Sequence, residues 1–351
     1  MKKNVFYLLL GFFALFLTTA CSDDNDTPQP ASKYRMAIFN EGNFQAGNAS
    51  ISLITPENEV ANNVFEQVNN RPLGDVAQSA IIINNKLYVT LNNSAKVEVM
   101  DAVSFLSIAT ILDNEKTAKP IYMQPLNKDQ AIVSDYGNSF MLVNTTTNAI
   151  VKKVDVKTAT KQMVGSEGKV FIAANNNLLV VDANNPENPR TIAITSTDES
   201  WFNARLVKDK QGNVWMLTSY AITCVDAKTE TIVKELKFEG NGIVSSSWPQ
   251  SQLDINKAGD QLFLMATENG KSAIFKIGIN DTALPAKALF ELPGTVQTPY
   301  NMAISPEGTV VVCDALDYKQ SGIVYEYDQS GTELNKWIAG INPQFILFSN
   351  K

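Results

Sequence analysis

Short runs of β-branched and aromatic residues, separated by turns rich in Asn, Asp, Gly and Ser, recur along almost the whole chain. Such runs are typical of strands, and hardly any stretch has the period of an amphipathic helix. One type follows a tight turn, as in "KLYVT" at Lys86 and "KVFIA" at Lys169. A second type follows a polar loop, as in "KVEVMD" and "NLLVVD". These two types form seven successive pairs, and a third type, such as "ETIVKELKF", comes after them.

One further strand precedes six of the pairs, for example "QSAIII" and "IYMQPL". The first pair lacks it, and the missing strand appears at the far end of the chain as "NPQFILFS", residues 342–349. The pattern predicts an all-β fold, a seven-bladed β-propeller with four-stranded blades whose ring is closed by the C-terminal strand. An array of two-sheet sandwiches is the rival, but it does not explain the displaced strand.

The N-terminus reads as a targeting segment, with Lys2 and Lys3 ahead of an apolar run at residues 5–17. That run is shorter than the about 20 residues of a transmembrane helix. It ends in "TTAC", which resembles the lipobox of bacterial lipoproteins, with Cys21 as the lipidation site. We therefore expect a signal peptide at 1–20, a flexible acidic and Pro-rich tether at 21–33, and a single propeller at 34–351. An ordinary secretory signal is the alternative.

The "SDDND" that follows Cys21 resembles the export signal of lipoproteins that Bacteroidetes place on the outer face of the outer membrane. This implies an outer-membrane protein that faces the cell exterior and touches the membrane through its lipid anchor only. "DTA" at residues 281–283 resembles a short O-glycosylation motif of the same bacteria, with Thr282 as the acceptor.

Charge and composition narrow the function classes. The net charge of −7 argues against nucleic acid, whose phosphates need a basic surface. The chain has no His, which removes the commonest general base and transition-metal ligand. We expect no catalytic residue, no metal and no cofactor. Cys224 and Cys313 lie in apolar runs, so we expect buried free thiols.

The long loops of a propeller lie on one face, between the second and third strands of each blade and at the crossovers between blades. Binding residues concentrate in such loops on a rigid scaffold. "VNNRPLGDVAQSA", residues 68–80, is the crossover from the first blade to the second. Arg71 and Asp75 are expected to pair across it, with Pro72 and Gly74 shaping the turn. A purely structural crossover and a ligand contact both remain open.

Amide and aromatic side chains predominate on this face, and Lys and Arg are scarce on it. Amides donate and accept hydrogen bonds, so they suit a large, weakly charged ligand rich in amide or hydroxyl groups, and they suit phosphate poorly. The alternative is that some of these Asn residues only shape β-turns and that some of the aromatic residues only fill gaps in the core. The candidate ligand-binding residues are Asn43, Phe44, Arg71, Asp75, Gln78, Asn92, Asn93, Asp135, Tyr136, Asn175, Trp201, Phe202, Tyr220, Trp248, Tyr300, Asp317 and Tyr318.

The phrases "FNEGNFQAGNASISLI", "NNRPLGDVAQS" and "LYVTLNNSAKVEVMDAVSF" resemble the YncE-like propeller lipoproteins of Bacteroidetes, which include the BtuG-type surface proteins. The resemblance covers the mature chain in blade layout and the first two blades in motifs. It implies a non-enzymatic protein that captures cobalamin or a related corrinoid and passes it to a TonB-dependent outer-membrane transporter. No ligand contacts are carried over from that family.

Two other classes stay open. A glycan-binding or protein-binding accessory lipoprotein of an outer-membrane uptake complex would use the same aromatic residues. A metal-dependent, lactonase-like propeller enzyme would need converging oxygen ligands. The candidates for those ligands are Glu41, Asp75, Asp135, Asp314 and Asp317.

Overall fold

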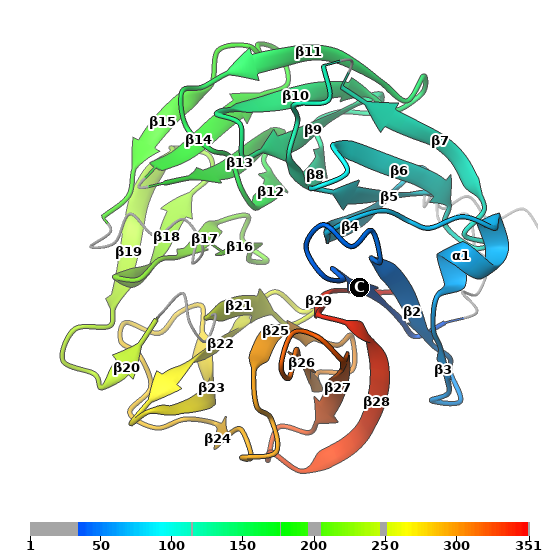
Figure 1. Cartoon of the computed structure of the whole chain (residues 1–351). Helices are drawn as coiled ribbons and strands as arrows, with labels where there is room; N and C mark the ends of the chain where they lie inside the picture. The colour runs from blue at the N-terminus through cyan, green and yellow to red at the C-terminus, as the bar shows by residue number, and fades with distance from the viewer. Residues whose placement is uncertain (1–33, 114, 176, 196–204, 246–250, 350–351) are drawn as a thin grey trace, which may run out of the picture. The chain divides into compact units, whose positions relative to one another are not determined.

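The computed structural model describes residues 34–349 apart from 114, 176, 196–204 and 246–250. Residues Lys33–Lys351 form one compact unit. Within this unit, seven antiparallel sheets follow one another around a common centre (Figure 1). Their innermost strands contact one another in a closed circle, in the order β29, β4, β8, β12, β16, β21, β25 and back to β29. The fold is therefore the predicted seven-bladed β-propeller.

The blades are numbered along the chain, and their strands are given from the axis outwards. Blade 1 contains β29 (Pro343–Phe348), β1 (Met36–Asn40), β2 (Ser50–Ile54) and β3 (Val60–Ala61). Blade 2 contains β4 (Ala77–Ile83), β5 (Lys86–Leu91), β6 (Lys96–Asp101) and β7 (Ser107–Leu112). Blade 3 contains β8 (Pro120–Pro125), β9 (Gln130–Asp135), β10 (Ser139–Asn144) and β11 (Ala149–Asp155). Blade 4 contains β12 (Met163–Ser166), β13 (Lys169–Ala174), β14 (Asn177–Asp182) and β15 (Arg190–Ala193).

Blade 5 contains β16 (Arg205–Lys208), β17 (Val214–Leu217), β18 (Ala221–Asp226) and β19 (Thr231–Lys237). Blade 6 contains β21 (Gln252–Ile255), β22 (Gln261–Glu268), β23 (Lys271–Gly278) and β24 (Phe290–Glu291), with β20 (Ile243–Val244) as an addition. Blade 7 contains β25 (Pro299–Ile304), β26 (Val310–Asp314), β27 (Ser321–Tyr327) and β28 (Glu333–Ile341).

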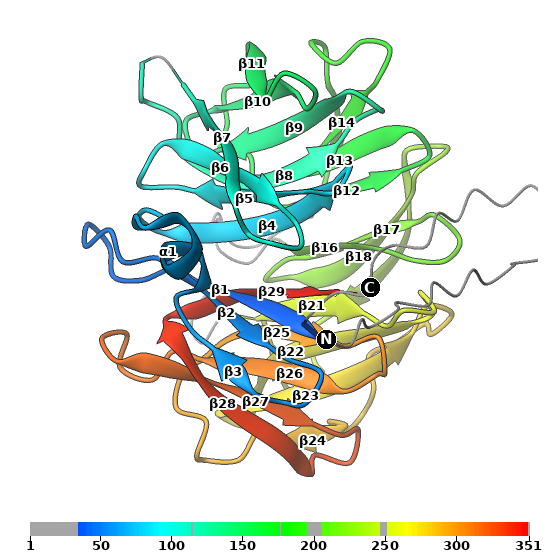
Figure 2. The same cartoon turned by 90° about the vertical axis from the view of Figure 1, so that its right-hand side faces the viewer.

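The C-terminal strand β29 closes the ring, as the sequence predicts. It pairs antiparallel with β1, in a register that runs from Met36 opposite Phe348 to Phe39 opposite Phe345. In Figures 1 and 2 the red end of the chain lies against its blue beginning. The chain passes from β28, the outermost strand of blade 7, directly to the innermost strand of blade 1.

The middle strands read as continuous apolar runs because both faces of each sheet are covered by neighbouring blades. Side chains alternate between the two faces of a strand. In β13, Val170 and Ile172 pack into the core shared with blade 3, while Phe171 and Ala173 pack into the core shared with blade 5. Each blade is thus held on both sides by apolar layers, which makes the scaffold under the loops rigid.

Three local features complete the fold. A short helix, α1 (Val64–Asn69), lies in the crossover between blades 1 and 2, where the sequence shows no helical period. Six residues with Phe65 as the single buried side chain are too few to show one. Strand β20 pairs with the C-terminal end of β22, through Ile243 opposite Glu268 and Val244 opposite Thr267. Cys224 and Cys313 are buried free thiols, as predicted.

In the described part of the chain, every helix falls short of the length and apolarity that crossing a membrane requires.

Candidate functional site

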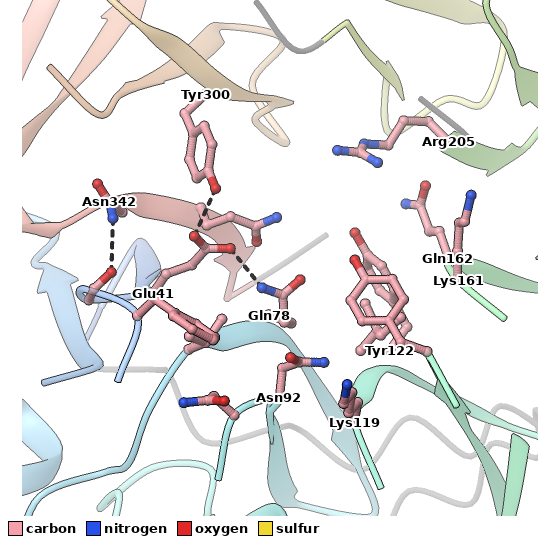
Figure 3. A pocket seen from close by; sticks show the side chains of 17 residues that line it. Glu41, Gln78, Asn92, Lys119, Tyr122, Lys161, Gln162, Arg205, Tyr300 and Asn342 are labelled. Carbon is pink, nitrogen blue, oxygen red and sulfur yellow. Dashed lines mark hydrogen bonds between the residues drawn. The ribbon is translucent and has the colours of Figure 1, made fainter. Parts of the chain in front are cut away.

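A cavity of ≈ 610 Å³ lies at the loop-face end of the propeller axis (Figure 3). Blades 1, 2, 3, 4, 5 and 7 contribute to its wall among the described residues. Below it a second cavity of ≈ 290 Å³ follows the axis between the inner strands and shares Tyr122, Gln162, Arg205 and Gln344 with the first. The upper cavity is lined by Glu41, Gly42, Phe44, Val76, Gln78, Asn92, Asn93, Lys119, Ile121, Tyr122, Tyr136, Lys161, Gln162, Arg205, Tyr300, Asn342 and Gln344.

Glu41 is held on one side of the cavity by two neutral donors. The Tyr300 hydroxyl donates to its Oε2 at 2.8 Å, and the Gln78 amide donates to its Oε1 at 2.7 Å. Its backbone is fixed as well, because its N–H donates to the carbonyl of Asn342 at 2.9 Å. Burial raises the pKa of the Glu41 carboxyl to about 7, against the smaller lowering effect of the two hydrogen bonds. This group therefore changes its charge near neutral pH.

Aromatic rings stand on two sides of the same space. Tyr300 packs edge-on against Tyr318, with ring centroids 5.7 Å apart. Tyr122 lies across the cavity from Tyr300 (Figure 3). Tyr136 also lines the cavity, and burial raises its pKa to about 12. The hydroxyl of Tyr136 hence keeps its proton at physiological pH. Phe44 is 69% exposed at the rim, where an apolar ring in water offers a surface for a ligand.

Three cationic residues line the cavity, namely Lys119, Lys161 and Arg205, and Figure 3 shows Lys161 and Arg205 across the open space from Glu41. They come from blades 3, 4 and 5, each just before or at the start of the innermost strand. Lys119 is exposed, whereas Lys161 and Arg205 are buried. Arg205 donates from Nε to Gln252 Oε1 at 2.6 Å, which orients its guanidinium group. The expectation that cations are scarce on this face is therefore wrong, because Lys119 and Lys161 lie at the ends of crossovers and Arg205 is the first residue of β16.

Several amide atoms around the cavity are buried without a hydrogen-bond partner among the described residues. They are Asn92 Nδ2, Asn342 Oδ1 and Gln344 Oε1. Asn342 donates a hydrogen bond from its Nδ2 to the Gly42 carbonyl oxygen at 2.8 Å. Its Oδ1 is the atom that can still accept a hydrogen bond. An unpaired buried donor or acceptor costs about 1–3 kcal/mol, so such atoms in native proteins call for a partner.

Comparison with known proteins settles the family. The sequence profile described as a domain of unknown function, DUF5074, matches residues 35–339. The chain belongs to the DUF5074 family. No curated protein matches its sequence.

Solved structures share the propeller fold of this DUF5074 chain at low identity. A Bacteroides fragilis protein provisionally assigned as a 6-phosphogluconolactonase has a TM-score of 0.66 at 12% identity, over 92% of this chain and 100% of that one. Dihydro-heme d1 dehydrogenase NirN has a TM-score of 0.57 at 10% identity, over 92% and 76%. BamB from Moraxella catarrhalis has a TM-score of 0.54 at 12% identity, over 90% and 85%. At such identities the likeness shows the fold alone.

The structure of the DUF5074 propeller brings part of the predicted residue set together. The predicted residues that line the cavity are Phe44, Gln78, Asn92, Asn93, Tyr136 and Tyr300. Asn43 and Tyr318, two further predicted residues, lie behind this wall. Asn43 Nδ2 donates a hydrogen bond to the Tyr318 carbonyl oxygen at 2.6 Å, which ties blade 1 to blade 7. Trp201, Phe202 and Trp248 lie outside the described residues.

The expected pairing of Arg71 with Asp75 is wrong. Arg71 instead forms an ion pair with the fully buried Glu98 at 2.6 Å and stacks over Phe65 at 4.9 Å. Asp75 accepts a hydrogen bond from Asn93 Nδ2 at 2.6 Å. Glu98 lies in the middle of β6, so the sequence offered no sign that it would meet the crossover.

The remaining predicted residues do not line the cavity, and their contacts are with other parts of the protein. Asp135 is buried and accepts from the backbone N–H groups of Lys119 and Gly137. Asp317 is exposed and accepts from the next turn of its own loop. Tyr220 lies under the Lys237 ammonium at 5.4 Å. Asn175 is exposed in the β13–β14 turn with a positive φ of 50°.

The acidic residues considered as metal ligands do not converge in the described part of the chain. No group of three or more Asp, Glu or Cys side chains there is placed to hold a metal ion. Asp314, for example, is buried and accepts from the backbone N–H groups of Gln297 and Thr298. Its carboxylate stabilises a crossover and does not face Glu41.

The lining residues that the loop analysis missed share one position in the blade. They stand at or next to the start of an innermost strand, where the chain turns down along the axis. The repeat itself was the available signal, since the start of every inner strand can be read from the sequence. The missed polar members are Lys119, Tyr122, Lys161, Gln162, Arg205, Asn342 and Gln344.

Proposed function

We propose that this DUF5074 propeller is a non-enzymatic capture protein that binds a large, amide-rich ligand in the loop-face cavity. A corrinoid such as cobalamin is the first candidate. The observation that carries the proposal is the set of buried amide atoms around the cavity, Asn92 Nδ2, Asn342 Oδ1 and Gln344 Oε1, which have no partner among the described residues.

The chemistry of these atoms matches the rim of a corrin. Two acceptors and one donor are left over, and a primary amide supplies both a donor and an acceptor. The broad apolar faces of a corrin suit the exposed ring of Phe44 and the rings of Tyr122 and Tyr136. The cavity volume of ≈ 610 Å³ lies within the roughly 300–1,000 Å³ of small-ligand sites. A ligand larger than the cavity would therefore insert only one part of its structure.

The cellular setting of the proposal comes from the N-terminal sequence. Lipidation at Cys21 would anchor the protein to the outer membrane, and the acidic tether would hold the propeller at the cell exterior. A TonB-dependent transporter would then receive the ligand, as the resemblance to BtuG-type lipoproteins implies. A glycan is the alternative ligand, because hydroxyl groups also donate and accept and sugars stack on aromatic rings.

The decisive experiment is a calorimetric titration of the protein with cyanocobalamin, and in parallel with a panel of glycans. We expect saturable binding of cyanocobalamin, weakened by about 1–3 kcal/mol in Asn92→Ala and in Gln344→Ala. Asn185→Ala, an exposed amide in the β14–β15 turn at the other end of the blade, is the matched control. Binding of a glycan without binding of cyanocobalamin would replace the corrinoid in the proposal.

A hydrolytic activity is the second candidate, favoured by one observation. Glu41 faces a cavity and titrates at about 7, which is where a general base works best at neutral pH. One structural neighbour carries the provisional assignment of 6-phosphogluconolactonase. The test is hydrolysis of 6-phosphogluconolactone, which the wild type would catalyse and Glu41→Gln would not. The absence of turnover in the wild type removes this candidate.

A further inference from the structure

We infer that Glu41 makes the loop-face cavity select a carboxamide group of the ligand and reject a carboxylate in the same place. This inference rests on the proposed capture function and adds the residue that determines specificity. Glu41 and Asn342 lie on the same side of the cavity, as Figure 3 shows, and Gln344 is the second residue of β29. We call these three residues the acceptor face.

The acceptor face is built where the C-terminal strand closes the ring. Just beyond the pairing of β29 with β1, the Glu41 N–H donates to the carbonyl oxygen of Asn342 at 2.9 Å. The Gly42 N–H donates in the same way to the carbonyl oxygen of Ile341 at 3.0 Å. Acceptor atoms from opposite ends of the described chain are thus held in one wall before any ligand arrives, which is the preorganisation that a specific site requires.

The side-chain oxygens of this face still have room for hydrogen bonds. Asn342 Oδ1 and Gln344 Oε1 are buried and have no hydrogen-bond partner in the part of the chain that the structure describes. A carboxylate has about four acceptor positions, and the bonds from Tyr300 and Gln78 use two of those on Glu41. The Asn342 amide nitrogen is already used as a donor to the backbone. A ligand group that meets these oxygens therefore has to donate.

Among the described residues, no Lys or Arg forms an ion pair with the Glu41 carboxyl group, whose pKa is set by burial and two neutral donors. Lys161 and Arg205 line the same cavity but lie across the open space from it (Figure 3). Glu41, Asn342 and Gln344 are 9%, 7% and 8% exposed, so solvent screens this face only weakly. A ligand carboxylate placed here would meet lone pairs and, above the pKa of Glu41, a like charge.

A carboxamide has nearly the shape of a carboxylate but the opposite effect on this face. Its NH2 group supplies two donors without a charge, whereas a carboxylate supplies acceptors only. The size of the cavity cannot separate two groups of one shape, so the distinction depends on Glu41 and on the two amide oxygens beside it. Such a site is specific through repulsion of the wrong group as well as attraction of the right one. A corrin carries several side-chain carboxamides, so the first candidate ligand has the required group.

The test uses cyanocobalamin and its monocarboxylic acid derivatives, in each of which one side-chain carboxamide is hydrolysed to a carboxylate. Binding is measured by calorimetry at pH 8, above the pKa of about 7 of the Glu41 carboxyl. We expect at least one derivative to bind the wild type about tenfold or more weakly than cyanocobalamin does. Glu41→Gln should reduce this difference to less than about threefold, because the substitution removes the charge and supplies an N–H donor.

A measurement on the wild type alone does not depend on the folding of a variant. At pH 6 most of the Glu41 carboxyl is protonated, and the derivative that binds weakly at pH 8 should bind within about threefold of cyanocobalamin. Tyr300, Tyr318 and Tyr136 are the other titratable groups near Glu41, and their raised pKa values keep them neutral at both pH values. The charged residues on the rest of the described lining are Lys119, Lys161 and Arg205.

A matched substitution separates this effect from a general change in charge. Glu57→Gln removes an exposed carboxyl from the β2–β3 turn at the other end of blade 1, and it should keep the discrimination of the wild type. Equal affinities for cyanocobalamin and all its derivatives at pH 8 would overturn the selection by Glu41 while leaving corrinoid capture intact. A difference that persists in a folded Glu41→Gln, or in the wild type at pH 6, would do the same.

A separate arm covers the case in which no corrinoid binds. Nicotinamide and nicotinate share one ring and differ as carboxamide and carboxylate, and they are then titrated at pH 8 and constant ionic strength while the melting temperature is followed. A saturable increase with nicotinamide that exceeds the one with nicotinate, and a difference that disappears in Glu41→Gln but remains in Glu57→Gln, supports the selection although the capture function has failed in its corrinoid form. No increase with nicotinamide, or equal increases with both, overturns the inference as well.

Discussion

At the scale of single residues, Glu41 differs from the buried glutamates Glu98 and Glu326. Glu98 and Glu326 are each met by an Arg, and Arg71 and Arg35 form their ion pairs at 2.6 Å and 2.8 Å. Burial acts to raise the pKa of each of these two groups, but their hydrogen bonds and charged neighbours outweigh it, and both pKa values lie below the usual range. Glu41 has only neutral donors, so burial prevails and its pKa rises to about 7.

This difference predicts a pH-dependent stability with a definite sign. A carboxyl whose pKa is raised by folding stabilises the folded state at low pH, and the contribution is lost as the pH rises from about 4.5 to about 7. Relative to Glu41→Gln, the wild type should lose on the order of 2 kcal/mol of unfolding free energy between pH 5 and pH 8. Urea unfolding of both proteins at the two pH values measures this. A constant difference between them would show that Glu41 does not titrate in this range.

At the scale of elements, the crossover from blade 1 to blade 2 is a structural joint. Arg71 reaches out of it to Glu98 in β6, which also receives hydrogen bonds from Lys96 at 2.9 Å and Ser107 at 2.6 Å. Gly74 has a φ of 143° and would place a Cβ atom within 2.8 Å of Ser94 Oγ, so the tight passage requires glycine. The crossover is thereby fixed to the blade that it enters.

Removing Arg71 should therefore cost stability although the residue lies on the loop face. Arg71→Ala leaves a fully buried carboxylate with one ion-pair partner fewer, and we expect a loss of about 1–3 kcal/mol. Arg190→Ala is the control, because Arg190 pairs with Glu230 on the surface and is 48% exposed. Its loss should stay below about 1 kcal/mol in the same denaturant titration. Similar losses of unfolding free energy for Arg71→Ala and Arg190→Ala would show that Arg71 has no special role in fixing the crossover.

The elements were predictable because their signal is local and repeated. A strand buried on both faces, such as β13, shows itself as an unbroken apolar run, and the turns between strands show themselves by Asn and Gly. The site was only partly predictable, because the described part of its wall is assembled from six blades. Lys161 and Arg205 are far apart in sequence, and only the ring of inner strands brings them to one side of a cavity. Short-range patterns locate the start of each inner strand, but they do not show which of these starts meet at the cavity.

At the scale of the whole propeller unit, the pairing of β29 with β1 makes the ring depend on the last strand of the chain. Ile346 packs into a core with Met36 and Ile38 of β1 and with Val311 of blade 7. Blades 1 and 7 therefore share an apolar layer to which the C-terminal strand contributes Ile346 and Phe348.

A charge in this layer should open the ring. Ile346→Asp buries an unpaired carboxylate at a position that is 7% exposed, and we expect a loss of at least about 3 kcal/mol. Ile338→Asp on the outermost strand β28, where the side chain is 64% exposed, is the matched control and should change stability by less than about 1 kcal/mol. Thermal unfolding followed by circular dichroism compares the two. Equal melting temperatures would show that β29 contributes little to closure.

The position of β29 also decides when the protein can be finished during its synthesis. Blades 2 to 7 take their strands from continuous stretches of chain and can form in their order along the chain. Blade 1 emerges first but must wait for the final segment, 342–351, with the inner edge of β1 unpaired in the meantime. A chain that stops before this segment keeps an open strand edge and an uncovered apolar layer, which are the features that proteases and chaperones detect. Blade 1 can therefore be completed only after the strands of blades 2 to 7 have been made.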